Sequence, residues 1–205
     1  MKKLSCVLAA AIFSVAAVSA EHSLGIYEGY SSGALVSNWN SDPVASLWTG
    51  AELSLFYACR FWGGLTISPE FTLSCGMDAQ ATVPAEAPTS PEDVLFRSGA
   101  GLSFGGALGL GYSKGHFSFL LYPVEYTRKY IFEKDVPYES GSGLTMYSSG
   151  LRFKWAWNLG PKDDPATRLG FYVGLSYPWK FECQDYDPKS AGVTARTGIV
   201  LDWLF

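Results

Sequence analysis

The sequence predicts an all-β protein, a closed antiparallel β-barrel of about eight strands that spans a membrane. Aromatic residues make up 16% of the chain and charged residues only 17%, a composition typical of membrane proteins. After residue 20, no apolar run reaches the length of about 20 residues that a membrane helix needs. Because only helices and closed barrels satisfy every backbone hydrogen bond in lipid, a barrel is the remaining architecture.

The N-terminal residues 1–20 have the pattern of a secretory signal peptide. Lys2 and Lys3 precede an apolar stretch that ends, at residues 18–20, in the small-x-small pattern recognised by signal peptidase. We therefore expect residues 1–20 to be removed and residues 21–205 to form one barrel domain. Without the two lysines, the 15 basic residues fall to 13 against 19 acidic ones, or about −6, so nucleic acid is not an expected partner.

Alternation of apolar and polar residues with a period of two predicts the strands. The odd positions of 51–61 are apolar and the even positions mostly small or polar, and the same odd face resumes at 65–73 after Gly63-Gly64, which predicts a hairpin. Further strands are expected at 99–112, 117–128, 151–158, 169–179 and 193–205, and a less regular first strand at Leu24–Tyr30. We expect a bulge near Pro123, because the alternation breaks there and proline cannot donate a ladder hydrogen bond.

The expected connections alternate in length. Long connections are predicted at 31–48, 76–93, 130–143 and 182–191, short ones at 62–64 and 113–116, and one of intermediate length at 160–167. Short periplasmic turns and long extracellular loops are typical of outer-membrane barrels, and this order places both termini on the periplasmic side. The 76–93 connection is rich in proline and includes the acidic residues Asp78, Glu86, Glu92 and Asp93, so an extended acidic loop is expected there.

Alternation alone does not decide which face meets water, and a soluble, lipocalin-like periplasmic barrel is the competing interpretation. Such a barrel would carry many Lys, Glu and Asp residues on its polar face. In this sequence that face is dominated by Gly, Ser, Thr and Ala, which suit a crowded interior. Aromatic residues gather near the predicted strand ends, as at Trp62 and Trp179, where they would lie at lipid headgroups. These features favour the membrane barrel.

The C-terminal residues carry a resemblance to a known family. Ile199, Leu201 and Trp203 share one strand face with the terminal Phe205, a pattern similar to the signal by which the outer-membrane assembly machinery recognises its barrels. With the signal peptide, the length and the strand number, the chain resembles small eight-stranded barrels of the OmpA, OmpX and OmpW type. This resemblance implies a place in the bacterial outer-membrane bilayer and insertion by the barrel-assembly machinery, but it carries over no binding residue.

Charged residues on the predicted inward face form the candidate site. The expected lumen charge network consists of Glu52, Arg60, Glu70, Arg152, Lys154, Arg196 and Asp202, with Arg168 near the rim. Opposite charges should pair in a lumen that side chains nearly fill. We therefore expect an occluded barrel with a structural role or a surface-interaction role through its extracellular loops. The alternative is a narrow channel for small or apolar solutes, which inward Phe56 and Tyr172 could contact.

Catalysis and bound cofactors are not expected. A lipid A-modifying enzyme of this size would need a nucleophile and a base near the outer leaflet, but His22 follows the cleavage site and His116 lies in a predicted periplasmic turn. After cleavage Cys59, Cys75 and Cys183 remain, an odd number that cannot pair fully, at a spacing that suits no zinc site. We expect them to be small apolar residues, buried or facing lipid.

Overall fold

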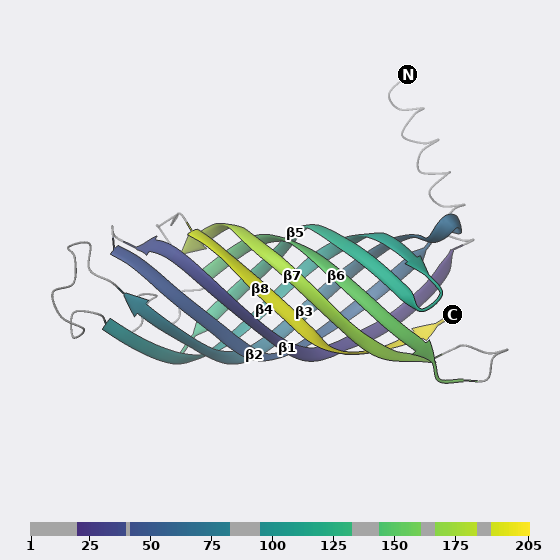
Figure 1. Cartoon of the computed structure of the whole chain (residues 1–205), viewed down its shortest axis with the longest axis horizontal. Coiled ribbons are helices and arrows are strands. Elements are labelled where there is room, and N and C mark those ends of the chain that lie inside the picture. The colour runs from purple at the N-terminus through teal and green to yellow at the C-terminus, as the bar shows by residue number, and fades with distance from the viewer. Residues whose placement is uncertain (1–19, 40–41, 83–94, 133–143, 161–166, 184–189) are drawn as a thin grey trace, which may run out of the picture.

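Within the described residues, which are 20–39, 42–82, 95–132, 144–160, 167–183 and 190–205, the computed structural model is a closed antiparallel barrel of eight strands. Each strand pairs with the next in the chain, and β1 pairs with β8 (Figure 1). The strands are β1 (Glu21–Trp39), β2 (Asp42–Arg60), β3 (Leu65–Thr82), β4 (Leu95–Lys114), β5 (Phe117–Ile131), β6 (Leu144–Asn158), β7 (Thr167–Cys183) and β8 (Ser190–Leu204). The predicted fold class is confirmed.

The seam between β1 and β8 removes the sheet edges. Its register runs from Ser23 opposite Leu204 to Ser37 opposite Ser190. At the end of the seam, the backbone N–H of His22 donates to the carbonyl of Phe205 at 3.3 Å, and the N–H of Phe205 donates back to His22 at 3.0 Å. Because the sheet closes, the backbone N–H and C=O groups along the seam bond to each other and need no water. A bilayer requires this, since its hydrocarbon offers no hydrogen-bond partners.

The two faces of the wall differ as the period-two pattern predicts. Large apolar side chains point outward and are exposed, for example Leu55 at 49% and Val173 at 46%. Buried side chains on the inner face are mostly Ser, Thr, Tyr and charged residues. An apolar exterior around a polar interior is the reverse of a water-soluble barrel, so it supports the membrane interpretation. The free thiols of Cys59 and Cys75 also lie at outward-facing positions, half-buried and exposed respectively.

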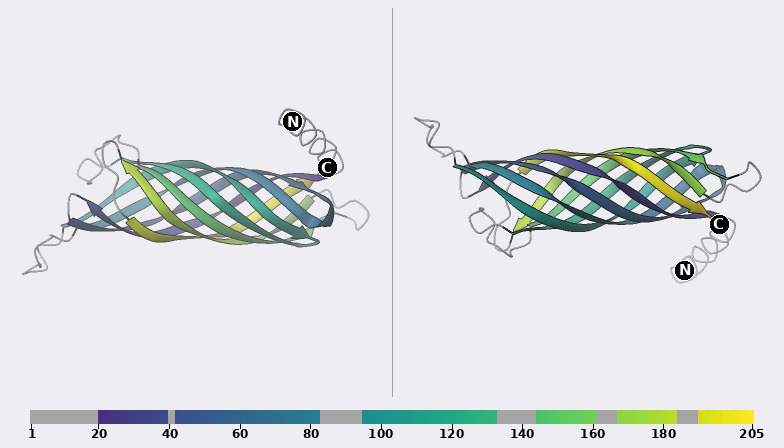
Figure 2. Two further views of the ribbon diagram at one scale, coloured as in Figure 1. Left: turned by 90° about the horizontal axis from the view of Figure 1, so that it is seen from above. Right: turned by 90° about the horizontal axis from the view of Figure 1, so that it is seen from below.

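The two short turns, the start of β1 and the end of β8 lie together at one end of the barrel (Figures 1 and 2). The first turn is a short 3-10 segment, η1 (Trp62–Gly64), in which Gly63 has φ 75° and Gly64 has φ 90°. Gly115 makes the second turn with φ 58°. These left-handed conformations favour glycine, which explains why the hairpins close at these positions. This end is called the inner end below, and the opposite one the outer end.

Several strands are longer than the sequence pattern predicts. The predicted loop 31–48 is wrong, because β1 and β2 pair as far as Trp39 opposite Asp42. The predicted loop 76–93 is also wrong in its first part, since β3 continues to Thr82 and includes Asp78; residues 83–94 lie outside the described residues. Similarly, 130–131, 182–183 and 190–191 belong to strands. Beyond the lipid band, the outward face need not be apolar, so the ladder continues where the hydrophobic alternation has faded.

The bulge expected near Pro123 is present. The pairing of β5 with β6 changes register between Tyr122 and Glu125, and the pairing of β4 with β5 shifts at the same place. Pro123 and Val124 both face outward, and Glu125 returns to the interior. The bulge therefore reverses the inward-facing parity of β5: even positions face the lumen before it and odd positions after it.

One carboxylate, Glu28 of β1, lies on the apolar exterior, opposite Leu53 of β2 and Ile199 of β8. It is six residues from His22, whose ring stacks with Phe205 at the inner end. Six strand residues at about 3.3 Å each, tilted by about 40°, rise about 15 Å. That height is near the middle of an apolar band about 25 Å tall.

Replacing Leu55 or Val173 with arginine should lower the free energy of unfolding from lipid by about 2 to 4 kcal/mol, because both side chains face the hydrocarbon away from the barrel ends. Leu65→Arg, near the inner rim, is the matched control and should cost about 0 to 1 kcal/mol. Denaturant titration in lipid vesicles measures both. Equal tolerance at all three positions would show that the outward face does not meet lipid.

Glu28→Leu should raise the free energy of unfolding in vesicles by about 1 to 2 kcal/mol, because a carboxyl group in hydrocarbon is destabilising, although less so than arginine. Lys114→Leu, at an exposed position beside the second turn, serves as the control and should change little. If Glu28→Leu destabilises the barrel, the carboxylate has a stabilising contact in the membrane.

Candidate functional site

The lumen contains a layered network of buried ion pairs. Glu52, Glu70, Arg152, Lys154 and Asp202 are all buried, and Arg196 is nearly so. Arg60 lies apart from them at the inner end, where its guanidinium pairs with exposed Glu21 at 2.7 Å. Opposite charges therefore meet inside the barrel in three groups, described in turn from the centre.

The central group surrounds Arg152. Its guanidinium bonds both carboxylate oxygens of Glu70 at 2.5 Å and lies 4.8, 4.9 and 5.4 Å from the ring centroids of Tyr27, Tyr122 and Tyr172. The Tyr122 hydroxyl donates to Glu70 at 3.0 Å. Phe56 stacks on Tyr27 at 4.4 Å between centroids. Charge-assisted hydrogen bonds and cation–π contacts offset part of the desolvation of this pair.

These six side chains, Tyr27, Phe56, Glu70, Tyr122, Arg152 and Tyr172, fill the middle of the lumen and are called the central plug. The four aromatic members are at most 2% exposed. Gly109 makes room for Tyr122: a Cβ at this position would lie 3.0 Å from the tyrosine ring. Gly101, another inward glycine of β4, makes similar room for Trp48 of β2: a Cβ there would lie 3.0 Å from the indole ring.

The inner group lies on the side of the plug that faces the chain termini. Arg168 bonds both carboxylate oxygens of Asp202, at 2.8 and 2.7 Å, and the Lys154 ammonium donates to the same carboxylate at 2.7 Å. Lys154 also lies 4.8 Å from the ring centroid of Phe56 in the plug. In this group two cations share one carboxylate.

The outer group lies on the opposite side of the plug. Arg196 lies between two carboxylates, with Nη1 2.8 Å from Glu125 and Nε 3.2 Å from Glu52. Ser148 also donates to Glu125, at 3.0 Å. Closer to the outer end, Asp78 accepts hydrogen bonds from Ser46 at 2.7 Å and from Lys129. The Lys129 ammonium lies 4.0 Å from the ring centroid of Trp48.

Three members of this network, Glu125, Lys129 and Asp78, were not in the predicted set. Glu125 and Lys129 were missed because the bulge at Pro123 makes the odd positions of β5 face the lumen after it. The sequence indicated the bulge, so these two inward positions could have been predicted from it. Asp78 was assigned to a loop, although its even position continues the inward face of β3. Arg168, expected near the rim, is 4% exposed, and its guanidinium donates to both carboxylate oxygens of Asp202.

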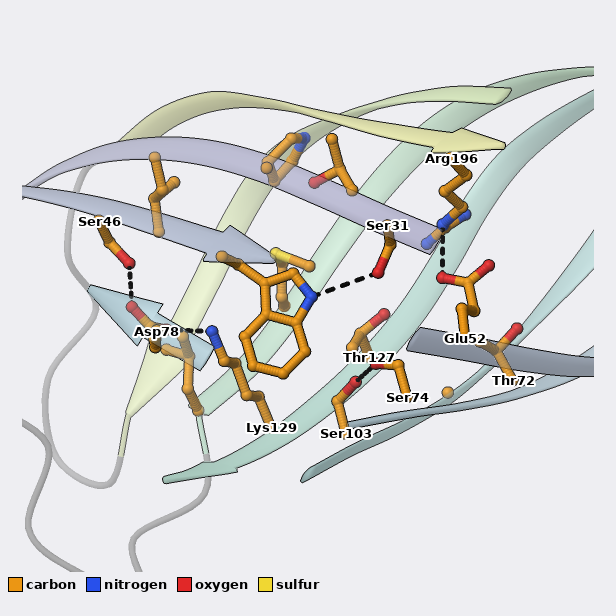
Figure 3. A pocket seen from close by; sticks show the side chains of 18 of the residues that line it. Ser31, Ser46, Glu52, Thr72, Ser74, Asp78, Ser103, Thr127, Lys129 and Arg196 are labelled. Carbon is orange, nitrogen blue, oxygen red and sulfur yellow. Dashed lines mark hydrogen bonds and ion pairs between the residues drawn. The ribbon is translucent and has the colours of Figure 1, made fainter. Parts of the chain in front are cut away.

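Among the described residues, a cavity lies on each side of the plug. The outer cavity has a volume of about 80 Å³ and is lined by Trp48, Glu52, Asp78, Lys129, Met146 and Arg196 among others (Figure 3). The inner cavity is much smaller, about 10 Å³, and is bounded by Arg60, Lys154 and Arg168 among others. The two cavities share no lining residue, consistent with a lumen interrupted at its centre.

Both histidines lie at the inner end. The Nδ1 atom of His22 is 2.6 Å from the Tyr57 hydroxyl, and the Nδ1 atom of His116 is 2.9 Å from the Ala156 carbonyl. Among the described residues, no group of three His, Cys, Asp or Glu side chains is arranged to hold a metal ion. No helix in the described part of the chain is both long and apolar enough to cross a membrane.

The predicted assembly residues lie along the end of β8 and just beyond it. Ile199, Trp203 and Phe205 are exposed on the outward face, and Leu201 is half-buried between them. The Phe205 ring stacks on His22, with 6.1 Å between centroids, so the terminal aromatic covers the inner end of the β1–β8 seam. Whether an assembly factor reads this strand stays a prediction.

The closed wall, apolar exterior and filled polar interior define a small transmembrane β-barrel. Neisserial surface protein A, NspA, has a similar solved structure, with a TM-score of 0.50, 11% identity, and coverage of 90% of this chain and 97% of that one. The outer membrane protease OmpT from Escherichia coli aligns at a TM-score of 0.44 and 8% identity, over 90% of this chain and 97% of that one. No protein-family model matches the sequence, and the curated proteins give no match. The chain thus has the fold of a bacterial outer-membrane β-barrel, as the sequence predicted.

Replacing Phe205 with alanine should reduce assembly in cells more than replacing lumenal Thr194 with alanine, because only the first change alters the proposed recognition strand. The measurement is the fraction of protein in the outer-membrane fraction that migrates as a folded, heat-modifiable barrel. Refolding of both variants into detergent without any assembly factor provides the control. Equal assembly of the two variants in cells would contradict a recognition role for Phe205.

Proposed function

We propose that this protein is an occluded barrel of the bacterial outer membrane, with a structural role or a surface-interaction role carried by its extracellular loops. The observation that supports this proposal is the central plug. Eight strands enclose a space that side chains nearly fill, whereas aqueous pores are built from about 16 strands. Here the space is filled by rigid aromatic rings around the Arg152–Glu70 pair, which makes passive flow through the centre unfavourable.

The proposal also covers orientation and partners. The inner end, with the short turns and both termini, faces the periplasm, and the outer end with its cavity faces the exterior. The expected partners are the lipid bilayer, the barrel-assembly machinery and an extracellular ligand. The protein is proposed to act without a cofactor and not as an enzyme, since both histidines lie at the end away from the outer leaflet.

A narrow path for small solutes is the second candidate. It is favoured by one observation: a cavity lies on each side of the plug, and Tyr27 and Phe56 of the plug line the inner one. In this alternative, a movement of the central side chains would connect the two cavities. Conductance measurements distinguish the two candidates.

In planar bilayers, the purified monomer should give small or rare conductance steps. The double variant Tyr27→Ala/Tyr172→Ala should give larger and more frequent steps, because it removes two rings of the plug while leaving the ion pairs in place. Thr194→Ala, which changes a lining residue of the outer cavity outside the plug, is the control and should conduct like the unmodified protein. Large, stable ohmic channels from the unmodified monomer would refute occlusion and establish the channel alternative.

A further inference from the structure

Charge is unevenly divided between the two sides of the central plug. Among the described side chains of the outer group, Glu52, Asp78 and Glu125 face only two cations, Lys129 and Arg196. The described side chains of this group thus include one carboxylate in excess. The plug itself is balanced, and the inner group has one cation in excess, because Lys154 and Arg168 share Asp202. A low-dielectric wall around the outer cavity strengthens the field of its extra negative charge.

Glu52 carries that excess charge at a buried position in the lining of the outer cavity. The residue is 5% exposed and lines the outer cavity, yet its Oε1 atom has no hydrogen-bond partner among the described residues. Its other oxygen is 3.2 Å from Arg196, whose Nη1 donates to Glu125 at the shorter distance of 2.8 Å. A buried carboxylate oxygen without a donor is costly, so a bound donor would be stabilised there.

The outer cavity already accommodates an ammonium group of the chain itself. Lys129 pairs with Asp78 and lies over the ring of Trp48, whose indole N–H donates to Ser31 at 3.3 Å. Carboxylate and aromatic ring together form a favourable environment for a cation. Glu52, deeper in the cavity, offers a second carboxylate for which the described residues provide no ammonium (Figure 3).

The remaining lining of the cavity has two kinds of surface. Hydroxyl groups of Thr72, Ser74 and Thr127 belong to the same lining as Glu52, and an ammonium group has three N–H donors to share among such oxygens. The lining also includes apolar side chains, among them Leu35, Leu144 and Met146, on strand segments toward the outer end. A ligand that is cationic at its inner end and apolar at its outer end would match both surfaces.

From these observations, we propose that the outer cavity binds a compact organic cation, a primary ammonium carried on a short apolar chain. The ammonium donates to Glu52, and the chain contacts the apolar lining. This inference goes beyond the proposed function, because binding at the outer cavity requires neither passage through the plug nor its absence.

The test compares three probes of similar size and different charge: n-butylammonium, n-butanol and butyrate. Refolded protein in a non-ionic detergent is titrated with each while the indole N–H signal of Trp48, assigned by its loss in Trp48→Phe, is followed by NMR. We expect saturable binding of butylammonium with a Kd at least tenfold lower than that of butanol or butyrate. Equal binding of all three, or saturation by none, would overturn the proposal.

Glu52→Gln tests the residue that carries the inference. The Kd for butylammonium should rise at least tenfold, while Glu21→Gln, the same change at an exposed inner-end carboxylate, should leave it unchanged. Arg196 keeps Glu125 as its partner in the Glu52 variant, which favours retention of the fold. An unchanged Kd in folded Glu52→Gln refutes the assigned role. If that variant does not fold, the comparison of the three probes on the unmodified protein still decides the proposal.

Discussion

Closure of the sheet by hydrogen bonds between β1 and β8 is the constraint on which the rest of the structure depends. A bilayer offers no water to an open strand edge, so a sheet that spans it has to be continuous. Once eight strands close, the diameter is set, and the interior becomes a space for side chains only. The outward apolar face, the inward polar face and the scarcity of free volume all follow from that geometry.

The narrow interior explains why its charges are so completely organised. Burying an isolated charge is strongly unfavourable, and an ion pair compensates only when its geometry and additional hydrogen bonds are good. Arg152 illustrates the solution: it bonds both oxygens of Glu70 and lies among three tyrosine rings, one of which also donates to the carboxylate. Removing one partner would leave the other buried without compensation, so each member of the pair depends on the other.

Charged side chains are unevenly distributed along the barrel axis, in addition to the difference between the apolar outer face and the polar inner face of the wall. Among the described side chains, the plug separates an outer group with one excess carboxylate from an inner group with one excess cation. The excess carboxylate of the outer group lies at the outer cavity, where one oxygen of Glu52 accepts no hydrogen bond from the described residues. On the exterior, Glu28 is a charged residue on an outward face that is otherwise largely apolar.

The sequence by itself determined the closed barrel, the direction of its faces and most lumen charges, because side chains alternate strictly along a strand and lipid selects one face. Residues such as Glu52 and Asp202 could be placed inside from parity alone. Parity could not reveal which charges meet, since partners such as Arg152 and Glu70 are 82 positions apart and come together only across the closed lumen. The outer reach of β1, β2 and β3 also depended on the structure, because strand pairing continues beyond the lipid band after the apolar signal has ended. Tertiary closure likewise decided how the described charges are divided between the two sides of the plug, because side chains from strands far apart in the sequence meet only inside the closed lumen.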